Sequence, residues 1–233
     1  MLKEISSTFN ILGGIFYQYF KVNDTANKFI GELALAQLDS LAYRDHHFGG
    51  LSLSAEFDTR DDKLIPNRGL YWNTMINGFW GADTEAKDFA KLRSDLRFYL
   101  SFRTDPRMVL VLRFGGAVNF GEYEFYHANF LGRTSNLRGF RSNRFAGDQM
   151  AYQNTELRFK LFKLRSYLLN GDAGILAFND VGRVWVKGED SNRWHDGYGF
   201  GVWLAPFEAL VLTANYNISI EEKTFTFTFN FLF

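Results

Sequence analysis

An alternation of apolar and polar residues recurs along most of this 233-residue chain, and it leaves little freedom in what the chain can fold into. The pattern is clearest in residues 88–103, where apolar positions alternate with lysine, arginine and aspartate. It returns in the closing segment KTFTFTFNFLF, in which one face carries five aromatic rings: Phe225, Phe227, Phe229, Phe231 and Phe233. A period of two is typical of β-strands with two unlike faces. The chain is therefore predicted to be all-β.

About ten segments follow this pattern, and most of them are long. A transmembrane strand needs about 9 to 11 residues in the hydrocarbon, whereas strands of globular sheets are most often about 5 to 6 residues long. Short and long connections also alternate, as in outer-membrane barrels. An even number of strands would place both chain ends on the same side of such a barrel. The predicted strands are residues 8–22, 48–59, 69–82, 88–103, 107–120, 150–165, 171–187, 196–206, 208–219 and 222–233.

Two β architectures fit the alternation. A soluble sandwich or lipocalin-like barrel points its apolar face inward and would leave the row Lys91, Arg93, Asp95 and Arg97 in water. A membrane barrel points the apolar face outward and the charged row into its lumen. In a soluble protein, the phenylalanine-rich last strand would be an aggregation-prone edge. We therefore predict a transmembrane antiparallel β-barrel of about ten strands.

Composition narrows the classes further. Aromatic residues make up 18% of the chain and proline only three residues, which suits strands. The formal net charge is zero, so no nucleic-acid partner is expected, and the absence of cysteine excludes disulfides and thiolate sites. No apolar run is long enough for a membrane helix, and we predict a single barrel domain over residues 1–233. The connection 23–47 is expected to hold a short helix.

One long connection, residues 121–149, fits neither strand nor helix periodicity and is rich in arginine, glycine and aromatic residues. Connections of this length in a compact fold are often functional. Its centre reads Leu137-Arg138-Gly139-Phe140. If the polar face of the barrel lines a lumen, this loop can fold inward and bring Arg138 to the carboxylates of Glu156 and Asp180, which both fall on polar strand faces.

These residues form part of an ordered set of motifs. Asp58-Thr59-Arg60-Asp61 and Pro66-Asn67-Arg68-Gly69 come first, and LRGF, NTELRF from Asn154, FNDVG from Phe178 and a terminal phenylalanine follow in that order. Over residues 48–233 the set resembles the bacterial surface antigen superfamily of outer-membrane proteins, which includes the barrel-assembly insertase, the translocation and assembly module and the two-partner secretion transporters. The resemblance implies an outer-membrane location and a loop folded into the lumen.

The resemblance also implies residue roles. Arg138 would be held by Asp180 and secondarily by Glu156, with Phe178 and Gly182 beside them on the lumen wall. The terminal strand, through Phe229, Phe231 and Phe233, would serve as the assembly signal and as one edge of the barrel seam. Members of the family usually have about sixteen strands and preceding periplasmic polypeptide-binding repeats. Here about ten strands and no such repeats are found in the sequence.

Three functions stay open at this stage. The first is insertion, assembly or translocation of client polypeptides at the outer membrane; the second is a structural or accessory barrel that scaffolds an outer-membrane complex. The third is a passive pore, which a loop in the lumen argues against. The barrel could close alone, or form a homo-oligomer or a composite barrel with other outer-membrane subunits. Outer-membrane lipid is the expected surroundings. No catalytic residue, metal site or cofactor is predicted, and solvation explains Asp45-His46-His47.

Overall fold

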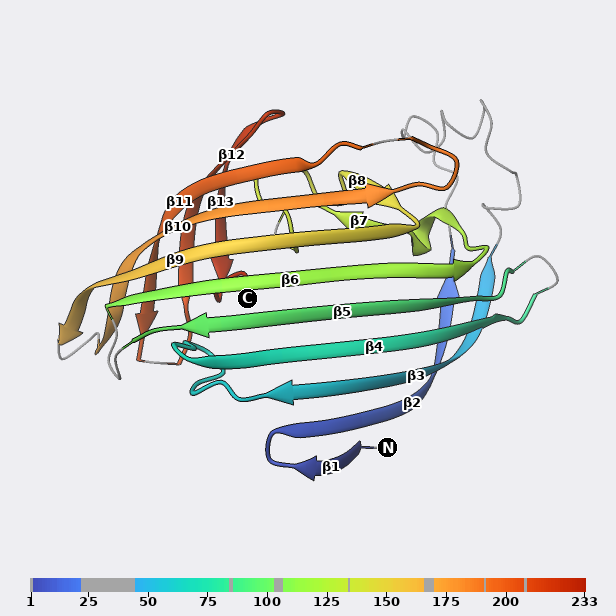
Figure 1. The fold of residues 1–233 in the computed structure, drawn as a ribbon, viewed down its shortest axis with the longest axis horizontal. Helices are drawn as coiled ribbons and strands as arrows, with labels where there is room; N and C mark the ends of the chain where they lie inside the picture. The colour runs from blue at the N-terminus through green and yellow to red at the C-terminus, as the bar shows by residue number, and fades with distance from the viewer. Residues whose placement is uncertain are drawn as a thin grey trace.

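The fold is one antiparallel sheet of eleven strands in a computed structural model that describes residues 2–21, 45–83, 86–102, 107–133, 135–165, 170–190, 192–207 and 209–233. The order in space is β1-β2-β3-β4-β5-β6-β9-β10-β11-β12-β13, so that sequence neighbours pair except across the long connection between β6 and β9. Figure 1 shows the sheet curving, with β11, β12 and β13 behind the front strands. The strands of this sheet are β1 (Leu2–Ser6), β2 (Phe9–Phe20), β3 (His46–Asp58), β4 (Gly69–Gly81), β5 (Phe89–Leu100), β6 (Met108–Gly121), β9 (Gln149–Arg165), β10 (Asn170–Trp185), β11 (His195–Pro206), β12 (Leu212–Ser219) and β13 (Lys223–Phe229).

All ten predicted strands are present, and β1 is an eleventh that the alternation did not indicate. Because every pairing is antiparallel and eleven is odd, β1 and β13 run in the same direction, which corrects the expectation from an even strand number. The long connections follow β2, β4, β6 and β10, so they lie at one end of the sheet, here called the loop end. The opposite end is called the turn end. The helix expected within residues 23–47 falls almost entirely outside the described residues.

The distribution of apolar and polar side chains over the two faces of the sheet is the reverse of that in a soluble protein. Phe227 on the outer face is 82% exposed, whereas Asp180 on the concave face is 0% exposed. Exposed leucine, isoleucine, phenylalanine and tryptophan side chains occur on β2 through β13, while buried arginine, asparagine and glutamate lie on the concave side, which we call the lumen. This distribution excludes the soluble alternative and suits a barrel in lipid. Within the described ranges, no helix has the length and apolar content to cross a membrane.

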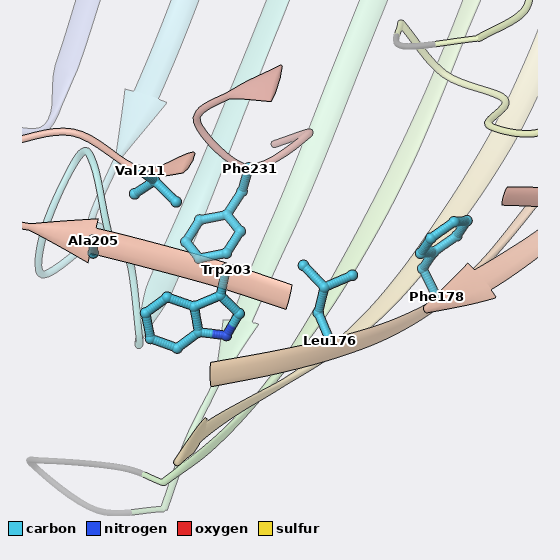
Figure 2. Packing of buried hydrophobic residues seen from close by; sticks show 6 residues of the cluster. All are labelled: Leu176, Phe178, Trp203, Ala205, Val211 and Phe231. Carbon is cyan, nitrogen blue, oxygen red and sulfur yellow. The ribbon is translucent and has the colours of Figure 1, made fainter. Parts of the chain in front are cut away.

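The long connection fills the lumen instead of projecting from the loop end. It contains a 3-10 turn, η2 (Phe125–His127), and a small hairpin of β7 (Asn129–Leu131) and β8 (Phe145–Gly147), which contacts β9 and β10. The prediction that it lacks regular structure was therefore incomplete. From the turn end, Leu64 and Ile65 of the β3–β4 turn pack against a lumen cluster formed by β10, β11 and the C-terminal segment. Figure 2 shows this cluster, in which the ring of Phe231 lies beside Trp203.

The C-terminal segment departs from the predicted alternation. Strand β13 ends at Phe229, and Asn230 has a positive φ of 76°, so the chain turns there. Phe231 and Phe233 consequently lie buried in the lumen and do not share the outer face with Phe229. The prediction that all five phenylalanines line one face of a strand was wrong for these last two residues. Their burial is explained by arginines of the lumen wall, which offer their rings a cationic surface.

Candidate functional site

The central feature of the lumen is a network of four charged side chains around Arg138. Its Nε and Nη2 donate to the two oxygens of Asp180 at 2.7 and 2.8 Å, and its Nη1 donates to Glu156 Oε2 at 2.6 Å. The backbone N–H of Arg138 also donates to Asp180, at 3.0 Å. A planar guanidinium is suited to this arrangement, because its donors diverge at fixed angles and bind one carboxylate through two bonds. The structure thus brings together the arginine and both carboxylates that the sequence singled out.

The fourth member is Arg158, two residues after Glu156 on the same face of β9. Its Nε donates to Glu156 Oε1 at 2.8 Å, and its Nη2 donates to the backbone oxygen of Phe233 at 2.8 Å. The guanidinium also lies 3.6 Å from the ring centre of Phe231. Sequence analysis did not single out Arg158, although its spacing from Glu156 places the two on one strand face. Arg158 therefore links the loop network to the C-terminal segment.

Charge balance makes this burial tolerable. Arg138, Arg158, Glu156 and Asp180 are all almost completely buried, two cations against two anions. Burial alone would lower the pKa of the Arg138 guanidinium, but ion pairing with Asp180 and Glu156 raises that pKa above its ordinary value. Removing one member of such a set leaves a buried charge without compensation, which costs far more than losing a surface ion pair. The network can therefore fix the loop firmly in the lumen.

Aromatic and apolar neighbours complete the seat of the loop. The ring of Phe178 on β10 lies 3.5 Å from the Arg138 guanidinium carbon. Leu137 and Phe140 are buried in a cluster with Leu131 and Tyr152. These contacts alternate with the polar ones along LRGF, so each residue of the motif except the glycine contributes a side chain to the lumen core.

Glycines permit the close approach of the loop to the sheet. Gly139 has a φ of +90°, and a Cβ there would lie 3.1 Å from the backbone oxygen of Ile218. Its own carbonyl oxygen accepts a hydrogen bond of 2.6 Å from Ser219 Oγ on β12. Gly197 on β11 lies directly against the carbonyl oxygen of Arg138, and a Cβ at Gly182 would be 3.0 Å from Leu131. A side chain at Gly197 would clash with the backbone of Arg138, and one at Gly139 would be strained by the positive φ.

A second polar cluster, which the sequence did not indicate as a unit, lies between β5, β6 and β9. Asp95 accepts from Arg97 Nε at 2.6 Å, from Arg113 Nε at 2.8 Å and from the Tyr152 hydroxyl at 2.9 Å. Arg113 Nη1 also donates to the backbone oxygen of Ser135 in the loop, at 2.9 Å. The loop is thus bonded to β6 through Arg113 as well as to β9 and β10 through Arg138.

The histidine and carboxylate side chains do not gather into a metal site in the part of the chain described. No group of three or more histidine, aspartate or glutamate side chains gathers there as a metal site would require. Asp45 and His47 instead bind the hydroxyls of Tyr19 and Tyr17 at the outer side of β2 and β3. The lumen offers charged and hydrogen-bonding groups that can bind and position polar ligands.

Comparisons with known proteins agree with this geometry. A family model described as the Omp85 superfamily domain matches residues 2–232. The fold is similar to a crystal structure of BamA from Haemophilus ducreyi lacking POTRA domains 1-3, with a TM-score of 0.73 and 14% sequence identity. The match covers 97% of this chain and 51% of that one, so the chain spans about half the length of the solved relative. A sequence search of curated proteins gave no match.

Proposed function

The chain belongs to the Omp85 superfamily, and from that premise we propose that it takes part in the insertion or translocation of other polypeptides at the bacterial outer membrane, where proteins of this fold reside. Such a role needs no covalent chemistry. An incoming segment in extended conformation can pair with a strand at the edge of a sheet through main-chain hydrogen bonds. The proposal therefore depends on an available edge and on a lumen wall that stays folded while the edge is used.

The edge strand β13 is the observation that carries this proposal. It forms one end of the sheet order and pairs with β12 through residues Lys223–Phe229. At seven residues it is shorter than the about 9 to 11 residues that a membrane strand needs. A short strand has fewer main-chain bonds to its neighbour, which favours exchange with an incoming strand. The anchored loop supports the proposal as well, because the network around Arg138 holds the wall of β9 and β10 independently of β13.

A passive pore fits the lumen poorly. The loop of residues 121–149 occupies it from the loop end, and the β3–β4 turn together with Phe231 occupies it from the turn end. Ions would have to cross two packed clusters. An accessory barrel that only scaffolds a complex is also compatible with a filled lumen. Such a barrel would not use the β13 edge, whereas the proposed function depends on it.

Photo-crosslinking in cells separates these two functions. A photoreactive amino acid at Phe227, on the outer face of β13, should give adducts with newly exported outer-membrane polypeptides. The matched control is Ile76, which is also exposed on the outer face but lies on β4 between two paired strands. Adducts confined to position 227 are expected. Absence of client adducts at both positions, in protein shown to be folded, would favour the scaffold. Equal client adducts at both positions would contradict the β13 edge as the site of client contact.

The way the barrel closes is tested by cysteine pairs introduced along β2 and β13. Crosslinks within one molecule would mean that the chain closes alone, and crosslinks between molecules would mean a composite barrel. In the structure β1 pairs with the edge of β2 that would face β13, so a β2–β13 seam requires β1 to be displaced. Strand β2 runs antiparallel to β13, and such a seam would then have the same hydrogen-bond pattern as the rest of the sheet. Absence of both products would contradict β2 as a partner of the seam.

A further inference from the structure

A row of charged side chains on the lumen face of β5 is separate from the network around Arg138. Lys91, Arg93, Asp95 and Arg97 follow one another at every second position, and Arg113 of β6 lies opposite Arg97 in the register. Four cations thus share the neighbourhood of one carboxylate. The arrangement differs from the balanced set around Arg138, where cations and anions are equal in number.

Asp95 neutralises only part of this row. Both Arg97 and Arg113 are ion-paired with it, and Arg113 donates further to Tyr152 and to the loop carbonyl of Ser135. These bonds hold both guanidinium groups in fixed orientations. A further carboxylate on the lumen side, Glu56, accepts a hydrogen bond of 3.1 Å from Tyr71. The cluster therefore retains a positive charge even if Glu56 is included.

Lys91 and Arg93 carry that excess. The Lys91 ammonium donates to the backbone oxygens of His127 and Ala128 at 3.0 and 3.3 Å, which uses two of its three N–H donors on neutral groups. Arg93 contacts the sulfur of Met75 at 3.8 Å, a weak acceptor. Among the described residues, neither side chain has an ion pair with a carboxylate. Two like charges at positions i and i+2 of one strand face repel each other, and a bound anion would relieve this repulsion.

All of these cations line one cavity of about 450 Å³ between the strand wall and the inserted loop. This volume is within the range of small-ligand sites, about 300 to 1,000 Å³. Neutral hydrogen-bonding groups complete its lining, namely those of Tyr71, Asn73, Asn129, Asn136, Asn143 and Tyr152. Guanidinium and ammonium groups together with amides and hydroxyls are the donors that proteins use for oxyanions of phosphate type.

We propose that this cavity binds a multiply charged oxyanion of phosphate type, with Lys91 and Arg93 as its principal ligands and Arg97 and Arg113 as pre-oriented neighbours. The phosphate group could come from a free solute or from a lipid headgroup that enters the lumen, and the chemistry of recognition is the same. This binding is independent of polypeptide insertion, since it uses β5 and β6 and not the β13 edge.

Equilibrium dialysis of folded protein in uncharged detergent, against labelled inorganic phosphate at constant ionic strength set by chloride, tests the proposal. Saturable uptake of one phosphate per chain is expected. The double variant Lys91→Gln with Arg93→Gln should bind at least tenfold more weakly. The matched control is Lys163→Gln with Arg165→Gln, which removes the same charge from the exposed turn end of β9 and should bind like the unmodified chain. Circular dichroism and heat-dependent gel mobility establish that each variant is folded.

A charge-conserving variant, Lys91→Arg with Arg93→Lys, keeps the test decisive if the glutamine variant does not fold, because it should retain binding within about threefold. Adding phosphatidic acid to the micelles distinguishes the sources: displacement of labelled phosphate indicates a headgroup that reaches the cavity, and no displacement indicates a free solute. The proposal is overturned if uptake is not saturable, if the glutamine variant binds as well as the unmodified chain, or if the control loses as much affinity.

Discussion

Two charged regions lie in the same lumen and are built on opposite principles. Around Arg138, two cations and two anions are buried and every cation has a carboxylate within 2.8 Å. Along β5, four cations surround Asp95, and Lys91 and Arg93 have only neutral partners among the described residues. A closed, balanced network is costly to break and fixes the loop. We expect an open, unbalanced one to contribute less to folding and to leave its cations available to a ligand.

The sharpest test of this contrast is Arg138→Ala, which leaves Asp180 buried without its main partner. We expect a loss of about 3 to 5 kcal/mol in the free energy of unfolding and rapid proteolysis of the 121–149 loop. Arg138→Lys should recover little, because an ammonium cannot reproduce the two-bond contact with Asp180. Urea unfolding and limited proteolysis are the measurements.

The control for that experiment is Arg141→Ala in the same loop. Arg141 is exposed and 3.8 Å from Glu222, so its removal should change stability by less than about 1 kcal/mol. If both alanine variants destabilise the protein equally, burial of the Arg138 network does not hold the loop.

A pH dependence is expected where the loop meets the open region. Burial, with a smaller contribution from Lys91, lowers the pKa of His127 to about 4, so the folded state favours the neutral imidazole. This contribution to stability is fully present above the unfolded pKa of about 6.5 and is lost as the pH falls toward 4, to a total of up to about 3 kcal/mol. The free energy of unfolding should therefore fall more steeply between pH 7.5 and pH 4.5 in the unmodified chain than in His127→Phe. Parallel curves would exclude His127 as the titrating group.

Accessibility gives a third test. A cysteine at Ala128, a buried loop position away from Arg138, should react with a membrane-impermeant thiol reagent at least tenfold more slowly than one at Asp190, which is exposed at the loop end. The reason is that the loop lies inside the lumen whereas residues 186–190 and 192–194, between β10 and β11, are exposed. Equal, rapid labelling in intact cells would contradict the inward position of the loop.

The smallest effect is predicted for Arg93→Gln. Its side chain is exposed, and among the described residues the one hydrogen bond that it donates goes to the sulfur of Met75, so the free energy of unfolding should change by no more than about 0.5 kcal/mol. A large destabilisation in urea would mean that the β5 row contributes to folding as the Arg138 network does. The contrast between the two regions would then fail.

The alternation of residue types predicted all of the strands of the large sheet except β1, since strands follow from a period of two. Which face meets lipid was predicted from strand length and from the phenylalanine-rich last strand, because the alternation also fits a soluble barrel. The alternation also placed Glu156 and Asp180 on the lumen side, where the structure puts them in contact with Arg138. It could not predict the position of Phe231, because alternation continues unchanged through the residue while the backbone turns at Asn230. Nor could it predict the charge imbalance along β5, because that depends on which carboxylates lie across neighbouring strands.

The order of pairing has a consequence for how the protein folds. Most of the sheet joins sequence neighbours and can form strand by strand, as hairpins do. The contacts that fill the lumen are different in kind: Arg138 meets Asp180 after 42 residues, Arg158 meets Phe233 after 75, and Gly139 meets Ser219 after 80. Such distant contacts bear a larger loop-closure entropy and form late. The lumen should therefore fill only after β12 has joined the sheet, so that protection of the loop from protease lags behind the appearance of β-structure during refolding.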